Sequence, residues 1–95
     1  MKGKQKRFLR AMAAALDPIV HVGKAGISEN LIVQVDTALE TRELVKIRVL
    51  SNSPIPVEAA AEEISRQTSA YLIQVIGRNF ILYRRSREKP VFELP

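Results

Sequence analysis

Apolar residues along the chain alternate between helical and strand spacing, and these changes of period divide it into seven predicted elements. Apolar positions three and four apart predict helices over about residues 3–16, 29–41 and 57–68. Short β-branched, aromatic or alternating runs predict strands over residues 18–22, 44–50, 71–76 and 80–83. The order α-β-α-β-α-β-β predicts an α/β fold in which a four-stranded mixed sheet packs against helices.

The first predicted helix has an apolar side and a basic side. Phe8, Leu9, Met12 and Leu16 share the apolar side. This side is short, rich in alanine and without Trp, so it favours packing on a sheet over lying on a membrane. Asp17-Pro18 ends the helix. The basic side is formed by Lys4, Lys6, Arg7 and Arg10.

The second predicted strand has one basic face. Val45, Ile47 and Val49 alternate with Lys46 and Arg48, and successive side chains of a strand point to opposite faces. We therefore expect helices to cover only the apolar face of the sheet at this strand.

The last two strands form a predicted hairpin that leads into a charged tail. Gly77-Arg78-Asn79 predicts a tight turn with Arg78 at its tip. We expect residues 1–85 to form one domain and residues 86–95 to be a less ordered charged tail. The arginines that extend the last strand are Arg84, Arg85 and Arg87.

The loop between the first strand and the second helix is suited to binding an anion. Gly23 and Gly26 can bring backbone N–H groups close to an external group. Ser28 suits the N-cap of the following helix, whose positive dipole end would then lie near Lys24 and favour a phosphate. The loop lacks the glycine patterns that bind nucleotides and dinucleotides, so no nucleotide cofactor is implied. Ordinary turn chemistry is the alternative reading of the two glycines.

Composition excludes several kinds of chemistry. The chain has 95 residues, enough for one domain, and no cysteine, so it has no disulfides, thiolate metal ligands or thiol nucleophiles. His21 is the only histidine, and no carboxylate constellation accompanies it, so we expect no catalytic residues, metal or cofactor. The acidic residues fall on helix faces remote from the glycine loop, which argues against a nuclease. No membrane span or signal peptide is predicted, and we expect a cytoplasmic protein.

The net charge of +5 is divided unevenly along the chain. Residues 1–28 carry +5, residues 29–63 carry −4 and residues 64–95 carry +4. If the two ends meet in space, the fold acquires a basic face and an acidic back. Such a distribution suits a domain that binds a polyanion.

Four stretches of the chain, in order, resemble the CRM domain, named for chloroplast RNA splicing and ribosome maturation. The chain is similar to the bacterial single-domain members of YhbY type from about residue 4 to about residue 85. The matching stretches are residues 19–28 (IVHVGKAGIS), 43–48 (ELVKIR), 74–78 (QVIGR) and 82–84 (LYR).

This resemblance implies a fold similar to the C-terminal domain of the third bacterial initiation factor. It also implies RNA binding without catalysis, contact with RNA through the loop at residues 23–26, and association with precursors of the large (50S) ribosomal subunit. We expect base readout to be minor, because the aromatic residues suit core or strand positions better than a stacking platform. These residues are Phe8, Tyr71, Phe80 and Tyr83.

The predicted RNA-binding residues combine the glycine loop, the first helix, the basic strand, the hairpin and the last arginines. The expected partner is rRNA, specifically large-subunit rRNA in pre-50S particles, with no membrane or small-molecule substrate, and we expect a monomer. The alternative is a protein–protein adaptor that uses the acidic residues 29–63, for which RNA binding would be weak even at low salt. The residues are Gly23, Lys24, Ala25, Gly26, Ser28, Lys4, Lys6, Arg7, Arg10, Lys46, Arg48, Arg78, Arg84 and Arg85.

Overall fold

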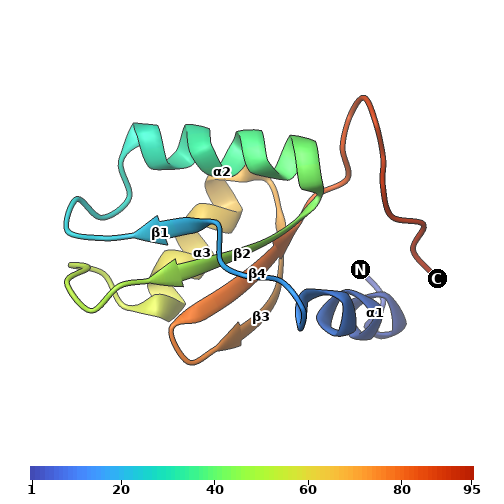
Figure 1. The fold of residues 1–95 in the computed structure, drawn as a ribbon, viewed down its shortest axis with the longest axis horizontal. Coiled ribbons are helices and arrows are strands. Elements are labelled where there is room, and N and C mark those ends of the chain that lie inside the picture. The colour runs from blue at the N-terminus through green and yellow to red at the C-terminus, as the bar shows by residue number, and fades with distance from the viewer.

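The computed structural model describes residues 1–95 and contains the seven predicted elements in the predicted order (Figure 1). None of the helices combines the length and the apolar character that a membrane crossing requires. The elements are α1 (Gly3–Ala13), β1 (Val20–Val22), α2 (Glu29–Arg42), β2 (Leu44–Val49), α3 (Val57–Thr68), β3 (Tyr71–Ile76) and β4 (Asn79–Tyr83).

Helix α1 ends three residues before the predicted boundary at residue 16. The chain leaves the helix through a turn in which the Leu16 N–H donates to the Ala13 carbonyl at 3.0 Å. Pro18 prevents the helix from extending further, because a proline disfavours helical backbone at the residue before it, here Asp17.

The four strands form one mixed sheet in the order β1-β2-β4-β3. Strand β1 is parallel to β2, whereas β4 is antiparallel to both β2 and β3. Parallel strands end at the same edge, so the loops after β1 and β2 leave the sheet together. The β3–β4 hairpin turns at this edge too, where the Val49 N–H donates to the Arg78 carbonyl at 2.7 Å. We call this edge the loop end.

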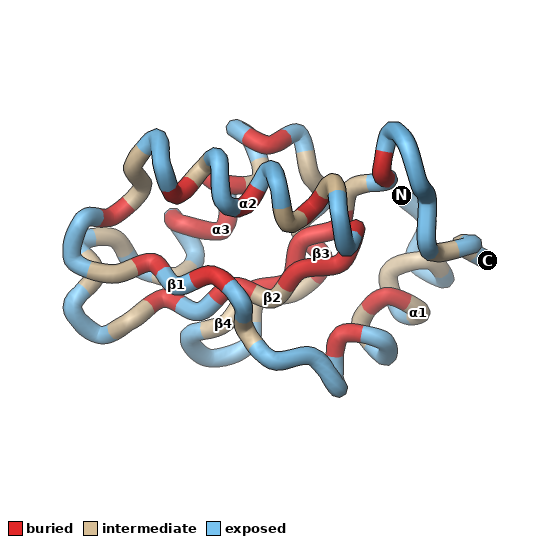
Figure 2. The backbone as a smooth tube through the Cα atoms, turned by 45° about the horizontal axis from the view of Figure 1, so that its top comes forward, coloured by how far each residue is buried: buried red, intermediate tan, exposed pale blue.

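The main core lies between one face of the sheet and helices α2 and α3 (Figure 2). Val45, Ile47 and Val49 point into it from β2, as their alternation predicted. Val35 of α2 and Ile64 of α3 meet them and are fully buried. The apolar residues at strand spacing and those at helical spacing are therefore buried against each other. This explains why these segments fold as predicted.

A smaller second core covers part of the opposite sheet face, so the prediction of one uncovered face is only half right. Leu9 and Ala13 of α1 pack there against Leu44, Ile81 and neighbouring buried side chains at the end of the sheet far from the loops. These two residues are four apart on α1 and share one stripe. Met12 and Leu16 were predicted on the packed side but are 44% and 37% exposed.

The C-terminal tail has no helix or strand, but it is held against the domain rather than loosely attached. The buried Glu43 carboxylate accepts hydrogen bonds from the backbone N–H groups of Ser86 at 2.7 Å and Phe92 at 2.8 Å, and also from that of Val91. The Phe92 ring meets Phe8 of α1 edge to face, with 6.4 Å between centroids. These contacts attach the tail to β2 and α1.

Candidate nucleic-acid interface

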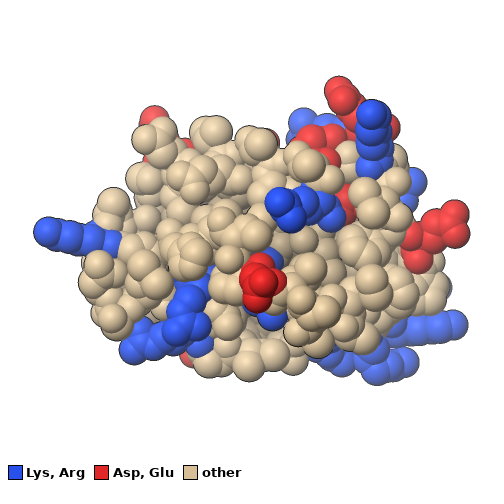
Figure 3. All heavy atoms as spheres, viewed as in Figure 1, with Lys and Arg blue, Asp and Glu red and all other residues tan.

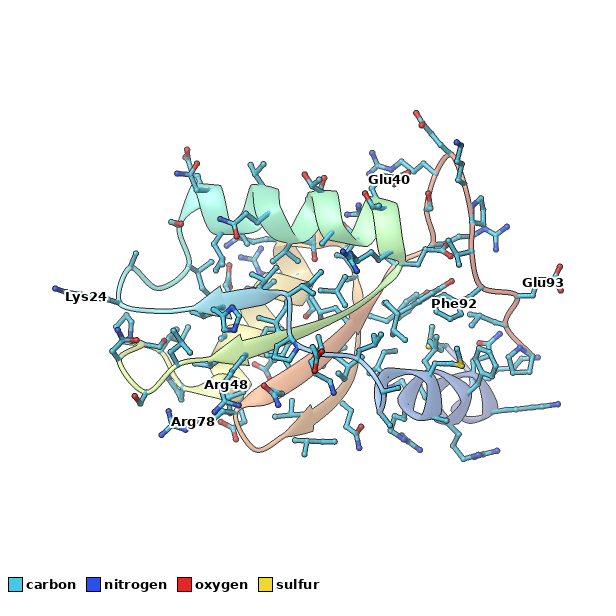
Figure 4. All side chains as sticks on the ribbon, viewed as in Figure 1. Lys24, Glu40, Arg48, Arg78, Phe92 and Glu93 are labelled. Atoms are coloured by element: carbon cyan, nitrogen blue, oxygen red, sulfur yellow. The ribbon has the colours of Figure 1, made fainter.

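The loop at residues 23–26 is a closed turn with an exposed tip. The Gly26 N–H donates to the Gly23 carbonyl at 3.0 Å, and Gly26 adopts a φ of +65°. Gly23 has no positive φ, so only the second glycine needs left-handed backbone. Lys24 and Ala25 are exposed at the tip, and the Lys24 side chain extends away from the molecule (Figure 4).

Several backbone N–H groups remain available at this turn. The Gly26 N–H is used within the turn, but no group of the chain accepts from the N–H of Lys24, Ala25 or Ser28. Ser28 caps α2 as predicted, with its hydroxyl accepting from the Leu31 N–H at 3.1 Å. Unpaired N–H groups beside the positive end of a 14-residue helix favour an anion.

The loop after β2 packs against the glycine turn. A β-carbon built on Gly23 would lie 3.6 Å from the Leu50 Cδ1 and 3.7 Å from the Asn52 Oδ1. A β-carbon on Gly26 would lie 3.2 Å from the Pro54 Cγ. The two loops therefore lie against each other, and the hairpin tip lies at the same edge of the sheet (Figure 1).

Three cations surround this edge without acidic partners. Arg48 is exposed on the open face of β2, and Arg78 is exposed at the hairpin tip (Figure 4). The only cations of the chain that form ion pairs are Arg66 and Arg84. Lys24, Arg48 and Arg78 therefore have no carboxylate within 4.0 Å. Their positive charge is thus available to an external anion.

The basic residues of α1 lie at the opposite end of the sheet from the glycine turn. Lys4 and Arg7 are exposed, while Lys6 and Arg10 are half-buried. Because α1 packs on the face that carries Arg48, its cations lie on the same side of the sheet as that residue. The structure thus separates the predicted residues into two groups on one side of the molecule.

One cation, Lys46, lies between these two groups. Lys46 lies on the open sheet face, two residues before Arg48 on β2, and is half-buried. Figure 3 shows Lys and Arg at the left end and in two separate groups at the lower left and the lower right. Helices α2 and α3, on the other sheet face, carry most of the acids, so the predicted basic face and acidic back exist in space. These acids are Glu29, Asp36, Glu40, Glu58, Glu62 and Glu63.

Arg84, which was predicted to bind RNA, has its guanidinium engaged within the domain. Its side chain is 11% exposed, and its guanidinium donates to the Asp36 Oδ1 at 2.6 Å and to the Thr68 carbonyl at 2.8 Å. It therefore joins α2 to the end of α3. Arg85 is exposed at the end of β4 that adjoins α1.

The aromatic residues form no stacking platform on the open face. Phe80 and Tyr83 are buried, and Phe8 is half-buried, as predicted. Tyr71 occupies a strand position, also as predicted, and is 52% exposed on the edge strand β3. Isolated in this way, it offers a single ring to solvent rather than the row of rings that stacks successive bases.

Sequence reasoning missed three polar residues near the loop end: His21, Ser51 and Asn52. His21 is exposed and pairs in register with Arg48. Strand alternation predicts that His21 lies beside Arg48 once the parallel pairing of β1 with β2 is known. The sequence did not indicate Ser51 and Asn52 as candidate site residues, because a polar loop between two predicted elements is common.

Comparison with known proteins shows the family to which the chain belongs. Residues 1–84 match the CRS1 / YhbY (CRM) domain model. The chain belongs to the CRM domain family. A relative of this CRM domain is the Bacillus subtilis (strain 168) protein named "Probable RNA-binding protein YqeI", which is 44% identical over 95 residues, covering 100% of this chain and 99% of the relative. An "RNA-binding protein" of Haemophilus influenzae is 35% identical over 92 residues, covering 97% and 92%.

A solved structure shares the fold of this CRM domain. It is the solution structure of a Staphylococcus aureus protein described as an RNA-binding candidate, with a TM-score of 0.82 and 47% identity, covering 100% of this chain and 99% of the other. None of these three relatives is named as an enzyme.

Proposed function

We propose that this CRM domain protein binds rRNA in precursors of the large ribosomal subunit and assists their assembly, acting in the cytoplasm as a monomer without a cofactor. The observation that carries the proposal is the group of cations with no carboxylate partner beside the unpaired N–H groups of the glycine turn. The names of the relatives support RNA as the partner. The family resemblance extends the proposal to pre-50S particles.

Binding proceeds through the sugar–phosphate backbone. Lys24, Arg48 and Arg78 neutralise phosphates at the loop end, and the N–H groups of Lys24 and Ala25 donate to a phosphate held at the turn. The cations of α1 and Lys46 extend the contact along the sheet. Acids on α2 and α3 orient the protein, because they repel RNA from the other side.

Crosslinking in cells, followed by sequencing of the bound RNA, tests this proposal. We expect large-subunit rRNA to be enriched over small-subunit rRNA and messenger RNA. A variant with Arg48→Glu and Arg78→Glu should lose these crosslinks. A matched control with Glu58→Gln and Glu62→Gln, on the acidic side, should keep them.

The adaptor alternative predicts the opposite pattern. A protein that attaches through α2 and α3 would still sediment with pre-50S particles after the arginine changes and would leave them after the acid changes. That result, or an absence of rRNA crosslinks in the parent protein, would contradict the proposal.

A further inference from the structure

A polar hollow of about 360 Å³ lies beside the glycine turn, between the end of β2, the loop after it and the hairpin tip. Arg48, Leu50, Ser51, Asn52 and Arg78 line it. It is in the size range in which protein pockets hold small ligand groups. Its lining contains two guanidiniums and no carboxylate, so the positive charge inside it is uncompensated.

The backbone holds the walls of this hollow in place. Arg48 is paired in register with Asn79, and the Arg78 carbonyl accepts from the Val49 N–H, so both arginines are fixed to the same strand pair. On the other side, the Ser53 N–H donates to the Leu50 carbonyl at 3.0 Å and closes a turn around Ser51. The backbone of this site is therefore fixed before binding, and only its side chains need to become ordered.

The side chains of Ser51 and Asn52 are available to a ligand. Neither makes a hydrogen bond within the chain, although the next residue, Ser53, uses its hydroxyl to bond the backbone of Ile55 at 2.9 and 3.1 Å. A serine hydroxyl and an asparagine amide each supply both a donor and an acceptor. The ribose 2′-hydroxyl also donates and accepts, and it is the group that distinguishes RNA from DNA.

The hollow and the glycine turn are adjacent. The Asn52 Oδ1 and the Leu50 Cδ1 lie within 3.7 Å of the position that a Gly23 β-carbon would take. A strand of RNA whose phosphate sits on the turn would therefore place its neighbouring nucleotide over the hollow. Arginine binds phosphate through two parallel hydrogen bonds, which suits the two guanidiniums to the next phosphate.

We propose that this hollow binds one ribose–phosphate unit of RNA and that Ser51 and Asn52 select RNA over DNA through the 2′-hydroxyl. The proposal rests on the proposed RNA-binding function and adds a site to it. Arg48 and Arg78 supply affinity for either nucleic acid, whereas the two polar side chains supply the discrimination.

Fluorescence anisotropy with single-stranded RNA and DNA of the same sequence tests this division of roles. We expect the parent protein to prefer RNA by about tenfold, as two hydrogen bonds of ordinary strength would give. The double variant Ser51→Ala, Asn52→Ala should bind RNA as weakly as DNA and leave DNA affinity unchanged. The variant Arg48→Gln, Arg78→Gln should weaken both by a similar factor.

Gln34→Ala, which removes an exposed amide from α2, is the matched control and should retain the RNA preference. Thermal melts must show each variant folded like the parent. Equal binding of RNA and DNA by the parent, or an unchanged preference in the Ser51→Ala, Asn52→Ala variant, would overturn this inference while leaving RNA binding intact. Failure of the parent to bind either nucleic acid would contradict the proposed function, and this inference with it.

Discussion

Gly23 and Gly26 have equivalent places in the sequence pattern, but the fold requires only one of them. Gly26 has a φ of +65°, and a β-carbon there would lie 3.2 Å from Pro54. Gly23 lacks this backbone strain, and a β-carbon would make only ordinary contact with Leu50 at 3.6 Å. The turn itself therefore does not require glycine at position 23, and the proposed function gives this residue the role of allowing close approach by a phosphate.

A substitution at Gly23 tests this distinction. Gly23→Asp should leave the melting temperature close to that of the parent but lower RNA affinity at least about tenfold, because a carboxylate would stand beside the phosphate. Gly23→Ala should have a smaller effect, and Lys24→Ala should weaken binding only modestly because the N–H groups remain. Filter binding with circular dichroism melts checks these outcomes. A folded Gly23→Asp protein with parental affinity would show that the turn does not contact RNA.

Arg84 and Arg85 are neighbours with different expected roles. Arg84→Ala removes hydrogen bonds to Asp36 and to the Thr68 carbonyl and should lower the free energy of unfolding by about 1.5–3 kcal/mol. RNA affinity of the folded variant should be unchanged. Urea unfolding and anisotropy measure the two quantities separately, with exposed Arg85→Ala as the comparison. If Arg84→Ala were as stable as the parent but bound RNA more weakly, Arg84 would act in RNA binding and not in stability.

At the scale of elements, Glu43 joins α2, β2 and the C-terminal tail. It ends α2 with a φ of 66° and is completely buried. Burial raises the pKa of its carboxyl, but hydrogen bonds from the N–H groups of Ser86, Phe92 and Val91, with a contribution from the charge of Arg85, lower it to a value below the ordinary 4.5. Glu40 reinforces the same connection by accepting from the Ser86 hydroxyl at 2.8 Å (Figure 4).

The pKa of Glu43 makes part of the stability depend on pH. A carboxyl whose folded pKa is lowered stabilises the fold above its unfolded pKa, near 4.5, and this stabilisation is lost as pH falls through the folded pKa. Glu43→Gln should lower the free energy of unfolding by about 1.5–3 kcal/mol at pH 7, and the difference from the parent should shrink below pH 4.5. Urea unfolding at pH 7 and pH 3.5 checks this expectation.

Glu93→Gln provides the control, because it removes an exposed carboxylate from the same tail. It should change stability little at either pH. A Glu43→Gln deficit that stays constant across the pH range, or that is absent at pH 7, would show that the ionised carboxylate does not hold the tail.

The elements could be predicted from sequence because apolar periodicity is local, whereas several side-chain roles depend on pairings between distant segments. The alternation in β2 correctly predicted which face is buried, since α2 and α3 cover that face. The packed side of α1 was misjudged because Ala13, rather than Met12, contacts the sheet. Arg84 looked like a surface cation because Asp36, its partner, lies 48 residues away in sequence.

At the scale of the whole molecule, the topology places the basic and the acidic segments of the chain on opposite sides of the sheet. Helix α1 packs on one sheet face, and the acidic helices α2 and α3 pack on the other. In the tail, the backbone N–H groups of Arg87 and Glu88 donate to the Glu40 carboxylate at the end of α2. The basic side is built from α1, β2, the glycine turn and the hairpin.

The salt dependence of rRNA binding tests this account most directly. The logarithm of the association constant should fall linearly with the logarithm of salt concentration, by about 0.7 to 0.9 per neutralised phosphate. Lys24, Lys46, Arg48 and Arg78 alone would give a slope of about −3, and phosphates neutralised by the cations of α1 would make it steeper. Replacing Arg48 and Arg78 by Gln should make the slope shallower by roughly 1.5. A slope near zero in the parent, or an unchanged slope in this variant, would contradict phosphate binding by the basic side.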